Sequence, residues 1–301
     1  MESCLCCPCT KGARGTVKWC NCEVLQGEMR VGAVHTEYAV ITGAASGLGL
    51  AFAKILKREC NLVLIDQKAV PPFADGTDTG RVEAVVGDVE NPETWQRARE
   101  RLRGHSPKWL VQCAGIAVTG AIGEAPLEYW RRAIGVNFLG TVLGCRTFVP
   151  DMLKESGGYV VNIASRAAIS GVPHFGPYAA SKAAVLALSE TLHNEVGDRI
   201  SVTVACPSYF RSNLEDCMLA SREVERQILH RRIENASRTA EQMAGAILEA
   251  ARGGHLYFFP PGEDRRYWLE KRCMPVRALH SIRNRFRAAL EGSNRPMERE
   301  R

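Results

Sequence analysis

Residues 38–49 read Tyr-Ala-Val-Ile-Thr-Gly-Ala-Ala-Ser-Gly-Leu-Gly, and an apolar stretch follows them as far as Glu59. The β-prone run predicts a strand, the glycines predict a turn, and the apolar stretch predicts a helix. Glycines in this setting let the backbone approach a pyrophosphate, whose charge is stabilised by free amide groups at the start of the helix. Gly43, Gly47 and Gly49 therefore predict a dinucleotide-binding turn.

An acid follows these glycines at the end of the next strand-like run, Asn61 to Asp66. A carboxylate in this position would accept hydrogen bonds from the adenosine ribose hydroxyls and repel a 2′-phosphate. Asp66 therefore favours NAD over NADP. An Arg or Lys nearby could still bind the phosphate, so NADP remains an alternative.

The remaining chain alternates strand-like and helix-like segments at the interval expected of a parallel sheet. We expect further strands at residues 81–86, 109–115, 159–165, 200–207 and 255–260, and helices at 92–103, 124–155, 178–196 and 241–252. The predicted fold class is α/β, with a single Rossmann-type doubly wound parallel sheet of about seven strands and helices on both faces.

Tyr178 and Lys182 are four residues apart at the head of an apolar, alanine-rich segment. In a helix, both side chains would project from one face, one turn apart. A phenol with a pKa of about 10 is a poor base at neutral pH unless a nearby cation favours its phenolate. Lys182 is such a cation, so the pair is a candidate acid–base site, and chance spacing on a helix is the alternative.

The composition is that of a soluble globular protein, with 46% hydrophobic and 24% charged residues among 301. No uninterrupted apolar run approaches the roughly 20 residues that a membrane-spanning helix needs, and the amino terminus lacks the apolar core of a signal peptide. We therefore expect a cytoplasmic protein. The formal charge is +6, but residues 265–301 carry ten Arg and one Lys against four Glu, and the rest sums to −1. This distribution argues against a nucleic-acid-binding surface.

The basic carboxyl-terminal segment has an apolar residue at every third or fourth position. Such a helix either rests peripherally on an anionic membrane surface or packs on the domain or a partner subunit. The apolar positions are Leu279, Ile282, Phe286 and Leu290, and the flanking cations are Arg277, Arg283, Arg285 and Arg287.

Three regions are expected besides the helical tail at 263–301. Residues 1–35 hold six of the twelve cysteines and no apolar periodicity, which predicts a disordered extension; metal binding, acylation and oxidation are alternatives, and translation could begin at Met29. Residues 36–262 form the dinucleotide-binding catalytic domain. Within it, residues 208–238 follow a strand and mix apolar residues with charges, so we expect a mobile substrate lid, or else an ordinary pair of surface helices.

Several further motifs follow one another in a recognisable order. They are Asp88 with Val89, Cys113-Ala114-Gly115, Asn137, Ser165 and Pro207-Ser208. Together with the glycine turn, Asp66 and the Tyr178/Lys182 pair, they resemble the short-chain dehydrogenase/reductase family from about residue 36 to residue 260.

The resemblance implies an NAD(P)-dependent oxidoreductase in which four residues form a catalytic tetrad. Tyr178 would move the alcohol proton, and Lys182 would shift the pKa of Tyr178 and hold the nicotinamide ribose. Ser165 would orient the reacting oxygen, and Asn137 would hold a water that links Lys182 to solvent. It implies no metal, and its cofactor-binding residues would be Thr42, Gly43, Ser46, Gly47, Leu48, Gly49, Asp66, Asp88, Val89, Cys113, Ala114, Gly115, Tyr178, Lys182, Pro207 and Ser212.

Three residues depart from the family's usual pattern. Cys113 stands where Asn is usual, which removes a side-chain amide that ties neighbouring strands together. Ser208 replaces a Gly after the proline and would narrow the backbone's approach to the nicotinamide. Ser212 replaces a Thr, but it still offers a hydroxyl to the carboxamide.

The function predicted is NAD(H)-dependent interconversion of an apolar secondary alcohol and its ketone. The apolar residues of the expected lid are the support for an apolar substrate, and they do not separate a steroid, a retinoid, a fatty-acyl alcohol or a small aromatic diol. The alternatives are an NADP(H)-dependent ketoreductase and a non-catalytic dinucleotide-binding regulator. We also expect a homo-oligomer, either a dimer or a tetramer.

Overall fold

The structure is a computed structural model, and it describes residues 35–73, 80–155 and 157–293. The cysteine cluster of the predicted amino-terminal extension lies outside the described residues. Its expected disorder and the metal, acylation and oxidation alternatives therefore stay predictions.

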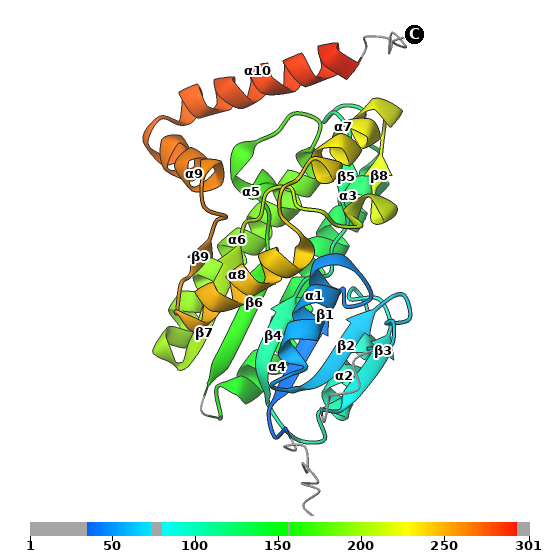
Figure 1. Ribbon diagram of the computed structural model, residues 1–301, viewed down its shortest axis with the longest axis vertical. Coiled ribbons are helices and arrows are strands. Elements are labelled where there is room, and N and C mark those ends of the chain that lie inside the picture. Colours follow the sequence, from blue (N-terminus) through cyan, green and yellow to red (C-terminus); the bar gives the residue numbers. More distant parts are fainter. Residues whose placement is uncertain (1–34, 74–79, 156, 294–301) are drawn as a thin grey trace, which may run out of the picture. The chain divides into compact units, whose positions relative to one another are not determined.

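A seven-stranded, fully parallel sheet forms the centre of the domain and confirms the predicted fold class (Figure 1). The strand order is β3-β2-β1-β4-β6-β7-β9. The strands are rich in Val, Ile and Leu because helices cover both faces, and parallel strands are then buried on both sides. Their bounds are β1 (Tyr38–Thr42), β2 (Asn61–Asp66), β3 (Val82–Val86), β4 (Pro107–Gln112), β6 (Gly158–Ile163), β7 (Ile200–Ala205) and β9 (Tyr257–Phe258).

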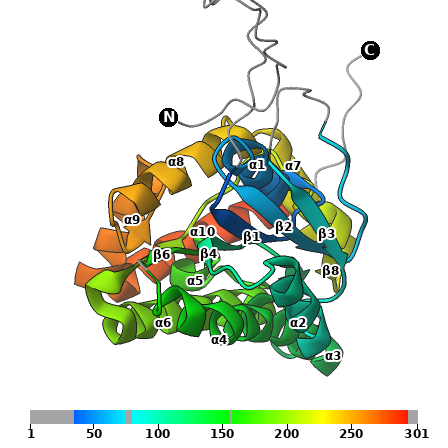
Figure 2. The same cartoon turned by 90° about the horizontal axis from the view of Figure 1, so that it is seen from below.

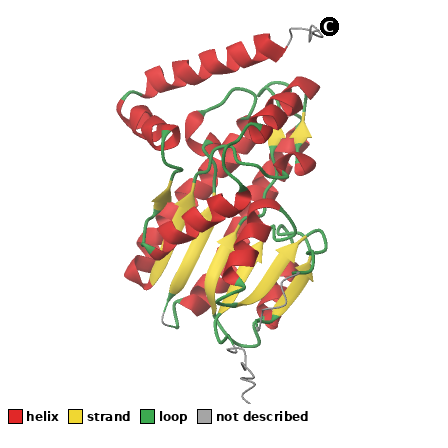
Figure 3. Cartoon of the chain, viewed as in Figure 1, coloured by secondary structure: helices red, strands yellow, loops and turns green. Residues whose placement is uncertain are grey.

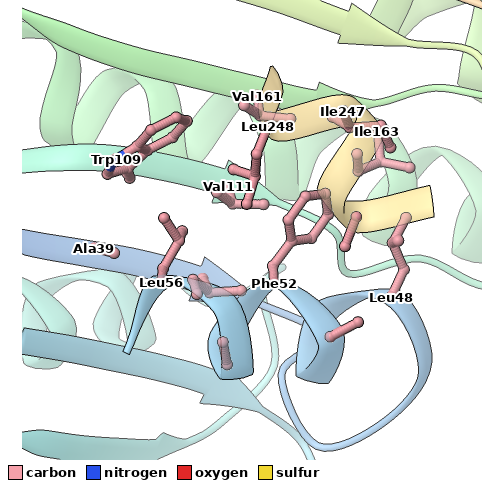
Figure 4. Close-up of a cluster of buried hydrophobic side chains, with 14 of the residues drawn as sticks. Ala39, Leu48, Phe52, Leu56, Trp109, Val111, Val161, Ile163, Ile247 and Leu248 are labelled. Carbon is pink, nitrogen blue, oxygen red and sulfur yellow. The ribbon is translucent and has the colours of Figure 1, made fainter. Parts of the chain in front are cut away.

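Helices pack on the two faces of this sheet (Figures 2 and 3). One face is covered by α1 (Gly47–Leu56) and α8 (Ala240–Arg252), and the other by α2 (Pro92–Arg101), α4 (Gly140–Met152) and α6 (Gly176–Val196). In Figure 4, Phe52 of α1 and Leu248 of α8 meet Val111 and Val161 of the sheet. This apolar contact holds α1 against the ends of the strands, where its first turn faces the predicted cofactor site.

A continuous helix runs through α3 (Leu127–Ile134), the π-helical turn η1 (Gly135–Leu139) and α4. By length and composition alone, this helix could cross a membrane. The sequence analysis did not predict this, because the helix contains no uninterrupted apolar run of the required length. Just over half of its apolar window is buried, and Phe148 and Met152 are fully buried against the sheet. We therefore interpret it as a core helix.

Smaller elements lie beyond the carboxyl ends of the strands (Figure 1). The predicted lid contains η3 (Leu214–Cys217), β8 (Leu219–Ala220) and α7 (Glu223–Glu234), and β8 pairs in parallel with β5 (Val118–Thr119). A short 3-10 turn, η2 (Gly197–Arg199), leads from α6 into β7.

The carboxyl-terminal segment forms two helices, α9 (Glu263–Cys273) and α10 (Pro275–Ser293). From the apolar positions of the predicted stripe, Ile282 is buried with Tyr267 against Ile169 of α5 (Ala167–Ser170). Leu279, in contrast, is 40% exposed. Part of the stripe therefore packs on the domain, and membrane contact remains a prediction for its exposed part.

Candidate active site

A cavity of about 250 Å³ lies at the carboxyl ends of β1 and β4, where the strand order reverses direction. Ligands of doubly wound sheets bind at such a switch point. The structure brings most of the predicted site residues together here. Those that line the cavity are Gly43, Ser46, Gly47, Leu48, Gly49, Asp66, Val89, Cys113, Ala114, Gly115, Ser165, Tyr178, Lys182, Pro207 and Ser212.

The glycine turn packs so closely against the backbone that Gly43 and Gly49 leave no room for a side chain. Gly43 has φ +67°, and a Cβ on it would lie 2.9 Å from the Ala114 nitrogen. A Cβ on Gly49 would lie 2.0 Å from the Gly43 oxygen. Ser46 caps α1 without a side-chain hydrogen bond, so the amide groups of the first turn stay available to an anion. These residues fit a dinucleotide pyrophosphate.

Asp66 is held rigidly at the end of β2. Its Oδ2 accepts a hydrogen bond from the Ala45 nitrogen and its Oδ1 accepts one from the Lys68 nitrogen, each at 2.9 Å. Lys68 and Gln67 also line the cavity, although the sequence analysis did not single them out. Asp66 and Lys68 therefore both line the cavity just beyond the end of β2, and the contact between them is made by the Lys68 backbone.

Thr42 and Asp88 have supporting contacts and do not line the cavity. The Thr42 Oγ1 accepts hydrogen bonds from the nitrogens of Cys113 and Ala114, both at 3.0 Å, and so ties the end of β1 to the end of β4. The Asp88 Oδ2 accepts a hydrogen bond from the Gln67 Nε2 at 2.6 Å. Through these contacts both residues hold groups that do line the cavity.

Asn137 also stands behind the cavity wall, inside the π-helical turn η1. Its Oδ1 accepts from the Ile116 nitrogen at 2.8 Å, and its Nδ2 donates to the Ile116 oxygen at 3.1 Å and to the Ser181 Oγ at 2.9 Å. A Cβ on Gly115 would lie 3.0 Å from the Asn137 Oδ1 and 3.2 Å from the Lys182 Nζ. Asn137 and Lys182 therefore flank Gly115 closely.

Burial controls the electrostatics of Tyr178 and Lys182. The Lys182 Nζ donates a hydrogen bond to the Ile163 oxygen at 2.8 Å and lies 6.0 Å from the centre of the Tyr178 ring. Burial raises the pKa of Tyr178 to about 12, against an opposing hydrogen bond from Ser165. Burial also lowers the pKa of Lys182 to about 8. Desolvation therefore dominates both pKa values in this arrangement, and the lowering of the pKa of Tyr178 by Lys182 stays a prediction.

The amide that Cys113 lacks has a substitute one residue earlier. The Gln112 Nε2 on β4 donates to the Asn162 Oδ1 on β6 at 3.0 Å, and the Asn162 Nδ2 donates to the Ser189 Oγ at 2.9 Å. The strands are therefore tied despite the substitution. Burial raises the pKa of Cys113 to about 12, which favours its protonated thiol form at neutral pH. The described residues contain no cluster of three or more His, Cys, Asp or Glu that could hold a metal.

The predicted lid forms the outer wall of the cavity. A Cβ on Gly47 would be 3.9 Å from the Ser212 Cβ, so the lid loop reaches the glycine turn. Val172 and Phe175 complete the apolar wall and were missed, because nothing in their local sequence distinguishes them from an ordinary loop. The lining residues from the lid include Tyr209, Phe210, Leu214, Leu229 and Ile233.

Comparison with known proteins gives one matching family model and several related dehydrogenases. The family model described as short chain dehydrogenase matches residues 37–222. The chain is 31% identical over 244 residues to 2-(R)-hydroxypropyl-CoM dehydrogenase of Xanthobacter autotrophicus, covering 76% of this chain and 92% of that protein. It is 27% identical over 241 residues to D-beta-hydroxybutyrate dehydrogenase of Rhizobium meliloti, covering 76% and 93%.

A solved structure shares the fold at a similar level of identity. The short chain dehydrogenase/reductase from Burkholderia phymatum in complex with NAD superposes with a TM-score of 0.68 at 25% identity, covering 89% of this chain and 98% of that chain.

Proposed function

The chain belongs to the short-chain dehydrogenase/reductase family of oxidoreductases, and from that premise we propose that it interconverts a secondary alcohol and its ketone with NAD(H). The observation that carries the proposal is the convergence of Ser165, Tyr178 and Lys182 on one cavity behind the glycine turn. This cavity joins an acid–base group to a dinucleotide-binding turn, which is the pairing that alcohol oxidation needs.

We assign each of the four tetrad residues a role that its contacts support. Tyr178 takes the proton from the alcohol, or returns it to the ketone, at its phenol oxygen. Ser165 hydrogen-bonds to Tyr178 and orients the reacting oxygen beside it. Lys182 provides the positive charge in the buried pocket, and Asn137 fixes the Ile116 backbone next to it. The bound cofactor would supply the hydride acceptor or donor at its nicotinamide C4.

NAD is the preferred cofactor because of the Asp66 carboxylate. Its two oxygens are oriented by backbone amides, and a 2′-phosphate placed next to it would meet a fixed negative charge. Lys68 beside it supports the NADP alternative, since an exposed ammonium group can bind a phosphate. The balance between these two charges decides the cofactor.

The substrate is an alcohol whose reacting part is apolar. Val172 and Phe175 pack in one cluster with Tyr178, and Leu229 and Ile233 line the same cavity. The names of two relatives, hydroxypropyl-CoM and beta-hydroxybutyrate dehydrogenases, also denote compounds with a secondary hydroxyl group.

A screen of secondary alcohols with purified protein, monitored by NADH absorbance, tests the proposal. We expect NAD reduction with apolar secondary alcohols and NADH oxidation with the matching ketones. NAD binding in calorimetry without turnover of any alcohol or ketone would instead support the non-catalytic regulator.

A further inference from the structure

A second cavity of about 540 Å³ adjoins the catalytic one. The two cavities share Arg166, Val172, Phe175, Ser208 and Tyr209 in their walls. The far wall of the second cavity comes from the end of α7 and from α10, two helices that contact each other over this part of the molecule (Figure 1). We call this second cavity the basic vestibule.

The charge of the basic vestibule is strongly positive. Its described lining contains one acid, Asp264, which forms an ion pair with Arg166 at 3.0 Å. Arg238 donates only to a neutral carbonyl, the Pro261 oxygen, at 3.4 Å. The arginines in the lining are Arg166, Arg231, Arg232, Arg238 and Arg285.

Arg231 and Arg232 carry the part of this charge that is free to bind a ligand. Both are exposed, and neither side chain makes a hydrogen bond or an ion pair within the described part of the chain. Both line the vestibule from the last turn of α7. Like charges at this density repel one another unless an anion lies between them, and guanidinium groups bind oxyanions in forked geometry.

We propose that the substrate is amphipathic, with an oxyanionic group such as a carboxylate or sulfonate bound by Arg231, Arg232 and Arg238. Its apolar part passes Phe175 and Tyr209 and brings the secondary hydroxyl to Tyr178. The inference rests on the proposed function and defines its substrate class. The vestibule selects the charged end, and the apolar wall selects the reacting end.

Binding measured by calorimetry in the presence of NADH, which accepts no hydride from an alcohol, tests the vestibule without turnover. We expect octanoate and octanesulfonate to bind the wild type at least ten-fold more tightly than 1-octanol does, and added salt to weaken only the anions. The double variant Arg231→Ala/Arg232→Ala should lose at least ten-fold affinity for the anions and keep its affinity for octanol. Arg283→Ala on α10 removes an exposed arginine outside the vestibule. It should change neither the affinity for the anions nor the affinity for octanol.

A turnover experiment separates this inference from the proposed function. Hydroxy acids with the hydroxyl on the penultimate carbon are compared with 2-alkanols of the same chain length. We expect a higher kcat/KM for the acids, which the double variant reduces through KM while kcat stays constant. Equal kcat/KM for acids and alkanols, or equal affinity for octanoate and octanol, overturns the vestibule and leaves the dehydrogenase standing. Anion binding at Arg231 and Arg232 without any redox turnover supports the vestibule and overturns the proposed function.

Discussion

The ammonium group of Lys182 donates a hydrogen bond to the backbone oxygen of Ile163 at 2.8 Å, although the lysine side chain is almost fully buried. A single neutral carbonyl replaces only part of the hydration that the cation loses, so burial lowers the pKa of Lys182 to about 8. The site therefore keeps its positive charge at neutral pH at the expense of folding stability.

Lys182→Met should stabilise the fold at pH 7 while it removes activity. Below pH 8, Lys182 is charged in both the folded and the unfolded state, and its desolvation lowers the free energy of unfolding by up to about 3 kcal/mol. Between pH 8 and 10.5 the unfolded state binds more protons, so wild-type stability rises with pH and the advantage of the variant shrinks. Melting curves from pH 6 to 11 measure this, and a variant without any advantage at pH 7 would refute the desolvation of Lys182.

Tyr178→Phe should abolish turnover and leave NAD binding intact. The change removes the only hydroxyl assigned to proton transfer and keeps the ring, and we expect kcat to fall by roughly 100- to 10,000-fold. The matched control is Tyr209→Phe, which removes another phenol from the same cavity wall and should retain activity within about ten-fold. Steady-state kinetics measures the loss of turnover, and calorimetry measures NAD binding. Turnover that survives in Tyr178→Phe would exclude the mechanism.

Gly115→Ala should lower kcat because the added methyl group pushes Asn137 and Lys182 away. The Cβ would lie 3.0 Å from the Asn137 Oδ1 and 3.2 Å from the Lys182 Nζ, and a displacement near 1 Å costs on the order of 100-fold in rate. Gly123→Ala is the control, because a Cβ there meets nothing within 4 Å. Both variants should fold, as checked by circular dichroism. Equal kcat values for the two variants would show that the close packing around Gly115 is not needed.

Asp66→Ala should relax the preference for NAD over NADP. Without the carboxylate, nothing fixed repels the 2′-phosphate and Lys68 can bind it, so the ratio of kcat/KM for the two cofactors should shift at least ten-fold towards NADP. Asp151→Ala removes a carboxylate that pairs with Arg99 away from the cavity, and should keep the ratio. An unchanged ratio in Asp66→Ala would contradict the assigned role.

The exposed part of the carboxyl-terminal helices should bind anionic vesicles. Val276 is 63% exposed and Leu279 is 40% exposed next to several arginines, and such a surface attracts acidic lipids. Arg283→Glu/Arg287→Glu should reduce co-sedimentation with phosphatidylserine-containing vesicles, while Arg58→Glu/Arg199→Glu, on other exposed surfaces, should not. Equal vesicle binding by the wild type and both double variants would contradict the membrane hypothesis. These charge changes leave the buried Ile282 in place, which truncation before α10 would not.

Much of the site could be predicted because its signals are local. Gly43 must be glycine because its φ is positive, and Gly49 must be glycine because a side chain would clash with the Gly43 oxygen. A four-residue spacing brings Tyr178 and Lys182 to one face of a helix. Asp66 ends a strand whose unbroken apolar character marks it as central. Patterns of this kind specify strands, turns and helices before any tertiary contact is known.

The sequence by itself predicted the parallel α/β fold, the glycine turn and the Tyr178/Lys182 pair, because local spacing and apolar periodicity encode them. Asn137 and Ser165 were expected only from the resemblance to the family. Only the tertiary structure decided that Gln112 supplies the strand tie which Cys113 lacks, that burial sets the pKa values of Tyr178 and Lys182, and that Arg231 lines a cavity beside the catalytic one. Burial and cavities arise where segments distant in the chain pack together. The residue spacing within one segment does not show which other segments will pack against it.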